Sequence, residues 1–348
     1  MPLLARMLAA PLVIDVRPGA IAGLTELLAD RRIAVSGRVA IAVGPGQGDA
    51  IGADLDVAKD HLLRVTDGSY DTAVELGGRL RAGSFEAVAG IGGGTTIDVA
   101  KFGAHMAGIP MVSVATSLAH DGIASPVSTL AHESGPGSYG VGPPVAVVVD
   151  LERVRRAPDA IATAGIGDVV SNLSAVSDWE LSAADTGEPL DGLAVAMARS
   201  AASAVLNQPG DVRSDEFLTV LAEALILSGL SMSVAGSSRP ASGGDHEIMH
   251  AMNKLYPGTA SHGELAGVGA LFCAFLRQDD SQFEAISSCL RRHGLPVLPP
   301  EVSDEQFAAA VELAPAMRPG RYTILERLAM SPDEIAKRVE EYVRAVAG

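Results

Sequence analysis

The chain of 348 residues has few cysteines, few aromatic residues and fewer basic than acidic residues. Only Cys273 and Cys289 are present, which excludes a disulfide framework and favours a cytoplasmic protein. Aromatic residues make up 4% of the chain, and 26 Lys and Arg against 42 Asp and Glu give a formal charge of −16. A chain with few stacking side chains and an acidic surface is not expected to bind nucleic acid.

Long apolar runs are also absent, since no segment approaches the ~18 apolar residues that a membrane span needs. The apolar N-terminal stretch is interrupted at Pro11 and Asp15, which indicates a first strand rather than a signal peptide. We therefore expect no membrane span. Glycine, by contrast, is in excess, with 38 residues or about 11% against a usual ~7%. This excess predicts tight turns, some of which approach a ligand closely.

Two different patterns divide the chain. Up to about residue 150, amphipathic segments alternate with six short apolar runs, at residues 12–16, 39–43, 61–65, 86–90, 111–115 and 145–149. This alternation predicts a parallel sheet with helices on both faces. From residue 161 onward helical periodicity dominates. We predict an α/β domain over residues 1–155 and an all-helical domain over residues 156–348.

The first motif is the glycine-rich segment GIGGGTTIDVAK at residues 90–101. It follows a predicted strand and opens a helix at Thr95, whose free N–H groups and positive dipole end suit a pyrophosphate. It matches neither Gly-x-Gly-x-x-Gly nor a Walker loop, so a purely structural turn stays open as an alternative. A second turn at residues 44–48 has no acid at the strand end to hold a ribose hydroxyl, which leaves NAD and NADP both open.

The second motif, His-Glu-Ile-Met-His at residues 246–250, matches the zinc-peptidase pattern. On a helix, His246 and His250 share one face, and Glu247 would act as the base. A zinc peptidase has no use for a phosphate-type glycine turn, so we prefer a different interpretation.

Two further residues suggest a metal site of another kind. His262 follows a break at residues 256–258, so His246 and His262 are expected on successive helices that face each other. Asp168, which follows Gly165 and Gly167, is expected at the start of the first helix of the second domain. One carboxylate and two imidazoles form an open site for Zn²⁺ or a related divalent ion, with positions left for substrate.

The fourth motif is the segment MVSVATSLAHDGIASPVS at residues 111–128. The strand is expected to end at Thr116 and Ser117, and the loop then presents His120 and Asp121. Polar groups at the carboxyl edge of a parallel sheet occupy the usual ligand crevice. An Asx-type turn that caps the loop is the alternative.

Together these motifs resemble the sn-glycerol-1-phosphate dehydrogenases, within the superfamily of iron-containing alcohol dehydrogenases, glycerol dehydrogenases and dehydroquinate synthases. Four blocks carry the resemblance: GIGGGTTIDVAK, ATSLAHDGIASP, SSRPASGGDHEIMH and SHGEL. It covers nearly the whole chain and implies a dehydroquinate synthase-like fold. One departure is that Gly244 and Asp245 precede His246, where family members commonly have Ser or Ala followed by Glu.

The resemblance implies that the first domain binds NAD or NADP and the second binds a metal ion and the substrate. It implies a metal held by Asp168, His246 and His262, with zinc favoured and nickel or iron as alternatives. Substrate contacts would come from Asp121, His250 and Asp168, with Asp121 or His250 relaying a proton. The implied cofactor contacts are Gly92, Gly93, Gly94, Thr95, Thr96, Ile97, Asp98, Thr116, Ser117, Leu118, Ala119 and Ser125.

The activity implied is a metal-dependent NAD(P)H oxidoreductase that interconverts dihydroxyacetone phosphate and sn-glycerol 1-phosphate by hydride transfer at C2. Lys254, Arg239 and backbone amides are candidates to bind the substrate phosphate. The family also suggests a homodimer or larger homo-oligomer.

Three alternatives remain. The first is a dehydrogenase for another small phosphorylated, phosphonylated or polyol ketone. The second is a sugar-phosphate cyclase of the dehydroquinate synthase type, whose first metal ligand is usually Glu where Asp168 stands here. The third is a non-catalytic nucleotide-binding protein, which a complete set of metal ligands disfavours.

Overall fold

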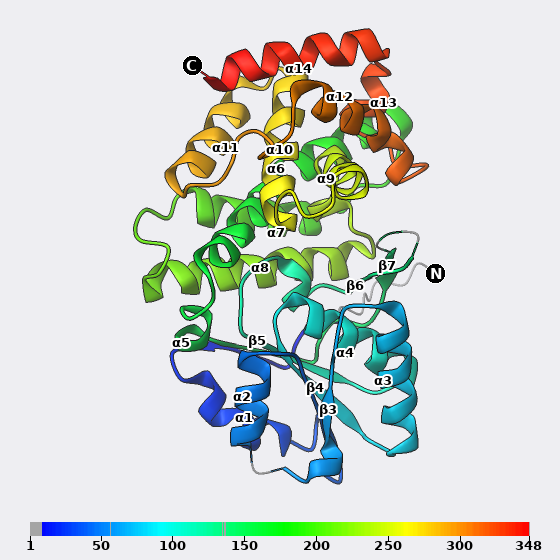
Figure 1. Cartoon of the computed structure of the whole chain (residues 1–348), viewed down its shortest axis with the longest axis vertical. Coiled ribbons are helices and arrows are strands. Elements are labelled where there is room, and N and C mark those ends of the chain that lie inside the picture. The colour runs from blue at the N-terminus through cyan, green and yellow to red at the C-terminus, as the bar shows by residue number, and fades with distance from the viewer. Residues whose placement is uncertain (1–8, 56, 134, 136, 348) are drawn as a thin grey trace, which may run out of the picture. The chain divides into compact units, whose positions relative to one another are not determined.

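The structure of the chain is a computed structural model that describes residues 9–55, 57–133, 135 and 137–347. The chain divides into two compact units, Met1–Ala157 and Pro158–Gly348. Strands and helices alternate in the first unit, and helices alone make up the described part of the second (Figure 1).

A parallel sheet of six strands forms the centre of the first unit, in the order β1-β8-β5-β4-β2-β3. The strands are β1 (Val13–Arg17), β2 (Val39–Val43), β3 (Leu62–Arg64), β4 (Ala87–Gly92), β5 (Met111–Ala115) and β8 (Ala146–Asp150). All six predicted strands are confirmed, because near-continuous apolar runs are typical of strands buried on both faces.

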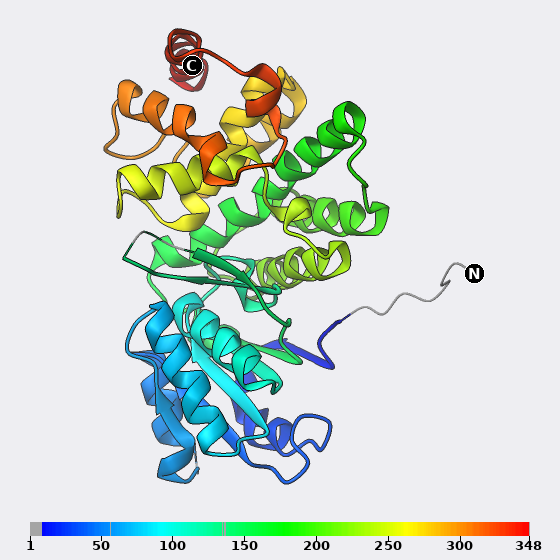
Figure 2. The ribbon, with the colours of Figure 1, turned by 90° about the vertical axis from the view of Figure 1, so that its right-hand side faces the viewer.

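Helices cover both faces of this sheet, as predicted. They are η1 (Ala20–Gly23), α1 (Leu24–Leu28), α2 (Gln47–Asp54), η2 (Lys59–His61), α3 (Tyr70–Ala82), α4 (Gly94–Ala107), η3 (Asp121–Ile123) and α5 (Leu151–Val154). On one face, Ile41 and Ile91 belong to a buried cluster with Leu24 of α1 and Ile51 of α2. Figure 1 shows α1 and α2 on one side of the strands and α3 and α4 on the other, and Figure 2 looks onto the α3 and α4 side.

The direction of the strand connections reverses between β2 and β4. From β2 the chain passes through α2 to β3 at one edge, then through α3 to β4 on the other side of β2, and through α4 to β5. Such a switch point opens a crevice at the carboxyl ends of the two strands, where ligands of open α/β sheets bind. The two glycine turns, at residues 44–48 and 92–94, follow these two strands.

A hairpin that the sequence did not predict lies between β5 and β8. Its strands β6 (Val127–Leu130) and β7 (Gly137–Gly140) pair antiparallel, with Val127 opposite Gly140, and β6 packs on α4. Each strand has four residues, and β7 reads Gly-Ser-Tyr-Gly, which lacks the β-branched residues that mark a strand.

The second unit is helical, as predicted. Its elements are α6 (Asp159–Thr186), α7 (Gly192–Leu206), α8 (Asp215–Ala235), η4 (Arg239–Ala241), α9 (Gly244–Leu255), α10 (His262–Arg277), α11 (Asp280–Arg292), α12 (Asp304–Leu313), η5 (Ala314–Met317), α13 (Ile324–Leu328) and α14 (Pro332–Ala347). Most residues of α10 are buried, because it packs against α6, α9 and α11.

Helix α8 is the one helix among the described residues that is long and apolar enough to cross a membrane. Of its apolar window, 67% is buried within the protein. It packs against α7, α6 and η4 of its own unit. This burial is that of a core helix, which accounts for the apolar composition.

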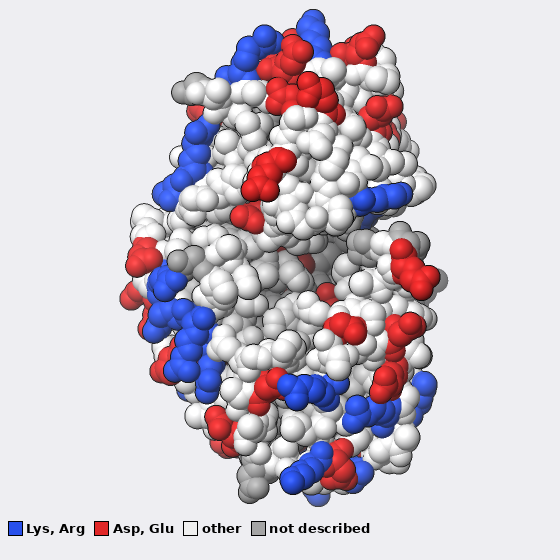
Figure 3. Space-filling view, viewed as in Figure 1, with Lys and Arg blue, Asp and Glu red and all other residues white. Residues whose placement is uncertain are grey.

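Charged side chains of either sign occur in small groups on the face that Figure 3 shows. Since 42 acidic residues outnumber 26 basic ones, the net charge does not attract an anionic ligand. Attraction for such a ligand must come from local features, such as a helix N-terminus, a metal ion or a few cations.

Candidate functional site

The start of α4 presents unpaired backbone N–H groups at the switch point of the sheet. The helix begins at Gly94, and its N-cap residue Gly93 makes no side-chain capping bond. The first helical bond runs from the Ile97 N–H to the Gly93 carbonyl, at 3.1 Å. The N–H groups of the first helical turn, from Gly94 to Thr96, precede that bond and can donate to an anion.

The two glycine turns and the loop after β5 pack together around this helix start. A Cβ atom on Gly44 or on Gly92 would lie under 3.0 Å from the Thr96 hydroxyl. A Cβ atom on Gly94 would lie under 3.0 Å from the His120 ring. Thr116 donates its N–H to the Gly92 carbonyl at 3.0 Å. The glycine backbone therefore lies directly against the Thr96 and His120 side chains, which leaves no room for a side chain at Gly44, Gly92 or Gly94.

Eight of the twelve predicted cofactor residues are buried: Gly92, Thr96, Ile97, Asp98, Thr116, Ser117, Leu118 and Ser125. Ile97 and Leu118 are fully buried, and Asp98 and Ser125 are nearly so. The Asp98 carboxylate pairs with the Lys101 ammonium at 3.1 Å. Because the side chains of Ile97, Asp98, Leu118 and Ser125 are buried, these four residues can contact a ligand only through backbone atoms.

Lys101 is a residue of this region that the sequence analysis missed. Its ammonium is buried and donates to the carbonyls of Gly122 at 2.7 Å and Ser125 at 3.2 Å. It thereby fastens the loop that carries Asp121 to α4. A lysine three residues after Asp98, among the apolar residues of a predicted buried helix, was the available signal.

Strand β5 ends at Ala115, slightly earlier than predicted, and the loop then forms the short helix η3. Gly122 donates its N–H to His120 Nδ1 at 3.0 Å, which fixes the imidazole. The Asp121 carbonyl accepts the N–H groups of Ala124 and Ser125, both at 3.0 Å. The Asp121 side chain is half-buried in this turn.

Three helices of the second unit bring together the predicted metal-binding residues: Asp168 of α6, His246 of α9 and His262 of α10. His262 Nε2 lies 3.3 Å from Asp168 Oδ1 and 3.3 Å from His246 Nε2, and His246 Nε2 lies 3.7 Å from Asp168 Oδ1. All three ligand atoms lie within 4.8 Å of one another. One carboxylate oxygen and two imidazole nitrogens form a donor set that suits zinc and related ions.

Glycines allow these three helices to approach closely beside the candidate ligands. A Cβ atom on Gly263 of α10 would lie under 3.0 Å from the Ala164 carbonyl of α6, and one on Gly167 would meet the Gly263 carbonyl. A Cβ atom on Gly269 of α10 would equally meet the Asp245 carbonyl of α9. Each ligand is therefore held next to a helix contact that only glycine permits.

Asp168 does not lie at a helix start, as the sequence analysis expected. It lies in the interior of α6, which begins at Asp159. The nearby glycines were interpreted as a helix boundary. In the structure α6 continues through them, because Gly167 serves the contact with α10.

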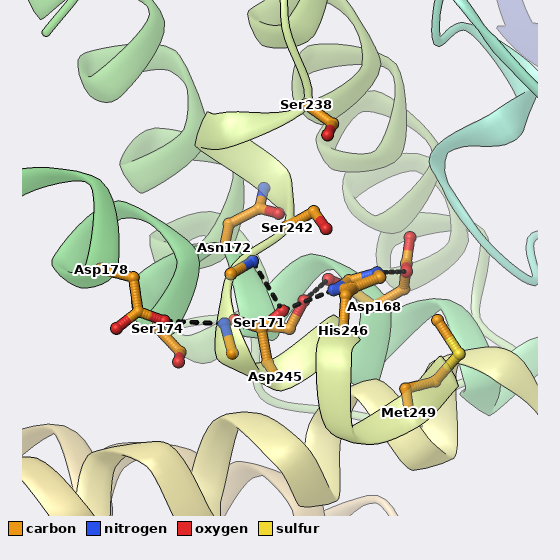
Figure 4. Close-up of polar contacts among 12 residues, drawn as sticks. Asp168, Ser171, Asn172, Ser174, Asp178, Ser238, Ser242, Asp245, His246 and Met249 are labelled. Atoms are coloured by element: carbon orange, nitrogen blue, oxygen red, sulfur yellow. Dashed lines mark hydrogen bonds and ion pairs between the residues drawn. The ribbon is translucent and has the colours of Figure 1, made fainter. Parts of the chain in front are cut away.

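Asp245 fixes the orientation of His246. It is fully buried, and its Oδ1 lies 2.5 Å from His246 Nδ1. Figure 4 shows Asp168 and Asp245 on opposite sides of the His246 ring. A proton on Nδ1, donated to Asp245, leaves the lone pair of Nε2 directed toward the other two ligands. Asp245 stands where family members commonly have Glu, and its carboxylate contacts His246 Nδ1.

The carboxylates also control the charge of this group. Burial would lower the pKa of His246, but its hydrogen bonds with Asp168 and Asp245 raise that pKa to about 9. Burial would raise the pKa of Asp168, but the two histidines hold it well below its ordinary range. Without a bound ion, His246 therefore carries a positive charge beside the negative Asp168, and a metal ion would displace the proton on Nε2.

Asp178 anchors the start of α9, which carries His246. It is buried in α6 and accepts the N–H of Gly244 at 2.8 Å and that of Ile324 at 2.9 Å. Arg277 of α10 completes the arrangement with an ion pair at 2.6 Å. One carboxylate therefore connects α6, α9, α10 and the start of α13.

His250 lies one helical turn beyond His246, with ring centroids 6.4 Å apart. Its Nε2 accepts a hydrogen bond from Arg318 at 3.1 Å, since a guanidinium only donates. Burial and the neighbouring Arg318 charge lower the pKa of His250 to about 2, so it is neutral. The sequence analysis did not predict Arg318, which is 68 residues away.

Glu247 lies away from the three ligands. Its side chain is fully buried, and its carboxyl group accepts a hydrogen bond from the Thr323 hydroxyl at 3.2 Å. Burial raises the pKa of Glu247 to about 9. The base that a zinc peptidase needs beside its metal is therefore missing from this side of α9.

The two side chains suggested for the substrate phosphate differ in their surroundings. Arg239 is buried and donates from Nε to Glu188 at 2.8 Å and from Nη1 to the Tyr322 carbonyl at 2.9 Å. Its charge is therefore already neutralised. Lys254 is exposed in the last turn of α9.

The chain is similar in sequence to proteins of a known family. The sequence profile described as iron-containing alcohol dehydrogenase matches residues 15–158. A glycerol-1-phosphate dehydrogenase [NAD(P)+] of Methanospirillum hungatei is 36% identical over 289 residues, covering 79% of this chain and 80% of the relative. The one of Pyrococcus furiosus is 34% identical over 327 residues, covering 91% and 92%.

Solved structures share the fold. A probable glycerol dehydrogenase from Sinorhizobium meliloti superposes with a TM-score of 0.79 at 21% identity, covering 99% of both chains. Sulfoacetaldehyde reductase from Bifidobacterium kashiwanohense, in complex with NAD+, gives 0.73 at 16% identity, covering 97% of this chain and 99% of the other. The sequence matches over most of both chains show that the chain belongs to the glycerol-1-phosphate dehydrogenase family of the iron-containing alcohol dehydrogenases.

Proposed function

We propose that the chain is a metal-dependent NAD(P)H oxidoreductase that interconverts dihydroxyacetone phosphate and sn-glycerol 1-phosphate. The observation that carries the proposal is the convergence of Asp168, His246 and His262 within 4.8 Å. It is supported by identity of 34–36% to two glycerol-1-phosphate dehydrogenases over most of each chain.

The donor set fits one divalent ion, with zinc favoured over nickel and iron. Asp168, His246 and His262 would hold it, and the buried Asp245 keeps His246 in the tautomer that can bind a metal. A bound ion would supply Lewis acidity to the ketone oxygen, and NADH or NADPH would supply hydride to C2.

The chain itself must deliver a proton to the substrate oxygen. Since Nε2 of His250 accepts the hydrogen bond from Arg318, its Nδ1 carries the proton that can pass to the substrate oxygen, and a proton from water would replace it. Asp121, in the loop fastened by Lys101, is the second proposed participant, and Asp168 is proposed to lie near the substrate.

The dinucleotide is proposed to place its pyrophosphate at the start of α4. The support is the start of α4, which has no side-chain cap, and the glycines around it, since side chains at Gly44, Gly92 and Gly94 would clash with their surroundings. The residues proposed to surround the cofactor are Gly92, Gly93, Gly94, Thr95, Thr96, Ile97, Asp98, Thr116, Ser117, Leu118, Ala119 and Ser125. Among them, Ile97, Asp98, Leu118 and Ser125 would contribute mainly by shaping the crevice.

We also propose that the chain acts in the cytoplasm as a homodimer or larger homo-oligomer, as its family suggests. Both cysteines are free thiols and buried, which is compatible with a reducing compartment. Light scattering on the purified protein should give at least twice the 35.6 kDa of one chain. A mass of one chain at micromolar concentration would refute this assembly.

Steady-state assays of the metal-loaded protein test the proposed reaction. Dihydroxyacetone phosphate should support faster NADH or NADPH oxidation than dihydroxyacetone, and glycerol should be a poor substrate in the reverse direction. Absence of turnover with the phosphorylated ketone would reject the proposal. A higher kcat/KM for another phosphorylated or phosphonylated ketone would favour the related dehydrogenase, and phosphate release would favour a cyclase.

A further inference from the structure

Four arginines of the second unit are buried or half-buried: Arg239, Arg277, Arg318 and Arg321. Two of them have carboxylate partners, since Arg277 pairs with Asp178 and Arg239 pairs with Glu188. Within the part of the chain that the structure describes, Arg318 and Arg321 have no carboxylate at ion-pair distance. Charges removed from water normally require such a partner.

Arg318 and Arg321 meet at one hydroxyl group. Arg318 donates from Nη1 to Ser238 Oγ at 3.0 Å, and Arg321 donates from Nη2 to the same oxygen at 2.9 Å. Arg321 also donates to the Ser242 carbonyl. Two cations thus converge on one neutral acceptor, and burial lowers the pKa of both guanidinium groups.

This pair lies next to the histidines of α9. The second terminal nitrogen of Arg318 reaches His250 Nε2 at 3.1 Å. Arg318 directly follows η5, which packs on α9, and Arg321 precedes α13. The two guanidinium groups are therefore held beside His250 by the fold of the segment between η5 and α13.

We propose that Arg318 and Arg321, bridged by Ser238, bind the phosphate group of the substrate. Two guanidinium forks offer several N–H donors and two positive charges, which suit the oxygens and charge of a phosphate dianion. The inference rests on the proposed function for the identity of the substrate. The half-buried cation pair itself implies only an anion of this class, a phosphate or phosphonate monoester.

The direct test measures binding of inorganic phosphate to the metal-free protein by calorimetry. Removing the metal excludes binding of phosphate to the ion itself. We expect a phosphate site whose affinity is about 10- to 100-fold weaker in Arg318→Gln and in Arg321→Gln, distinct from any phosphate held at the start of α4. Arg327→Gln is the control, because Arg327 is exposed and its nearest ion-pair partner is Asp185 at 3.6 Å. Unchanged binding in both arginine variants would overturn the proposal.

Kinetics of the metal-loaded protein provide the second measurement. In Arg321→Gln, KM for dihydroxyacetone phosphate should rise about 10- to 100-fold, while kcat/KM for unphosphorylated dihydroxyacetone stays within about 3-fold of wild type. If Arg321 had only a structural role, kcat/KM would fall by the same factor for the phosphorylated and the unphosphorylated ketone. Ser238→Ala, a milder change that keeps both cations, should raise the same KM by a few-fold.

The two proposals fail in different ways. Turnover of dihydroxyacetone phosphate with wild-type KM in both arginine variants would overturn the phosphate site and leave the proposed function. Phosphate binding that depends on both arginines, in a protein that does not reduce dihydroxyacetone phosphate, would overturn the proposed function and leave the anion site.

Discussion

At the scale of single residues, His246 and His250 share one face of α9 but are proposed to have different tasks. His246→Ala should remove one of three ligands, so that bound metal and activity fall together. His250→Ala should keep the metal and lower kcat by about 10²- to 10⁴-fold, the range for loss of a proton-transfer group. Metal analysis by mass spectrometry, together with kcat, distinguishes the two. Full metal content in His246→Ala would contradict the ligand assignment.

Asp245 provides a second prediction at this scale. Asp245→Asn removes the charge that orients His246, so metal affinity should fall by about 10- to 100-fold. Competition with a chelator of known affinity measures the change. Glu312→Gln is the control, since Glu312 is an exposed acid of α12. Equal affinity in Asp245→Asn and wild type would mean that the contact with Nδ1 has no role in metal binding.

The candidate ligands could be predicted from residue type and spacing, but their partners could not. A carboxylate and two histidines are recognisable from a known family pattern. Arg318 is not, because its role arises only when η5 packs against α9 and brings it to His250, 68 residues away. Asp245 adjoins a histidine in sequence, but its full burial appears only in the structure.

At the scale of helices, the contact between α6 and α10 sets the distance between Asp168 and His262. Gly263→Ala would place a Cβ atom under 3.0 Å from the Ala164 carbonyl and push the helices apart. We expect a loss of about 1–3 kcal/mol or more in the free energy of unfolding, together with weaker metal binding.

Urea unfolding of the metal-free protein measures the first effect, and chelator competition measures the second. Gly192→Ala is the matched control, because nothing lies within 4 Å of an added Cβ at the start of α7. That substitution should leave stability unchanged or raise it by up to about 1 kcal/mol. A stability loss shared equally by both variants would contradict the packing argument.

Some strands and helices could be predicted from the sequence and others could not. Apolar runs predicted all six strands of the parallel sheet, because burial on both faces leaves a clear pattern. The β6–β7 hairpin was missed because Gly-Ser-Tyr-Gly carries no strand signal. The start of α6 was misplaced because a glycine in a helix contact looks the same in sequence as a glycine that ends a helix.

At the scale of the whole molecule, Tyr342 attaches the C-terminal helix α14 to the rest of its unit. Its hydroxyl donates to the Val297 carbonyl at 2.5 Å, and its ring lies 5.1 Å from that of Phe272. Burial raises the pKa of Tyr342 well above its ordinary value. The unfolded chain therefore releases this proton at lower pH than the folded protein does. The stabilisation is complete below about pH 10 and is lost as the pH rises further.

Tyr342→Phe should accordingly have two effects. At neutral pH the lost hydrogen bond should lower the free energy of unfolding by about 1 kcal/mol. Between about pH 9 and pH 11 stability should decline less steeply than in wild type, because the titrating group is gone. Denaturant unfolding across that range checks both effects, and an identical decline in the two proteins would contradict the argument.

An acidic protein can bind anionic ligands when its positive groups are concentrated at the binding sites. The formal charge of this chain is −16, but the features proposed to contact anions are local. They are the start of α4, a three-residue metal site and the Arg318–Arg321 pair. The first two could be anticipated from the sequence. The third could not, because only the packing of the helices reveals that these two half-buried arginines lack a carboxylate partner among the described residues.

The central claim is that a metal ion held in the second unit lets the chain reduce dihydroxyacetone phosphate with NADH or NADPH. The most direct measurement follows nicotinamide absorbance with this ketone before chelation, after chelation and after zinc is added back. We expect oxidation of the nicotinamide to stop on chelation and to return with about one zinc ion per chain. Reduction that continues at the same rate in protein shown to be free of metal, or no reduction in the fully loaded protein, would contradict the account.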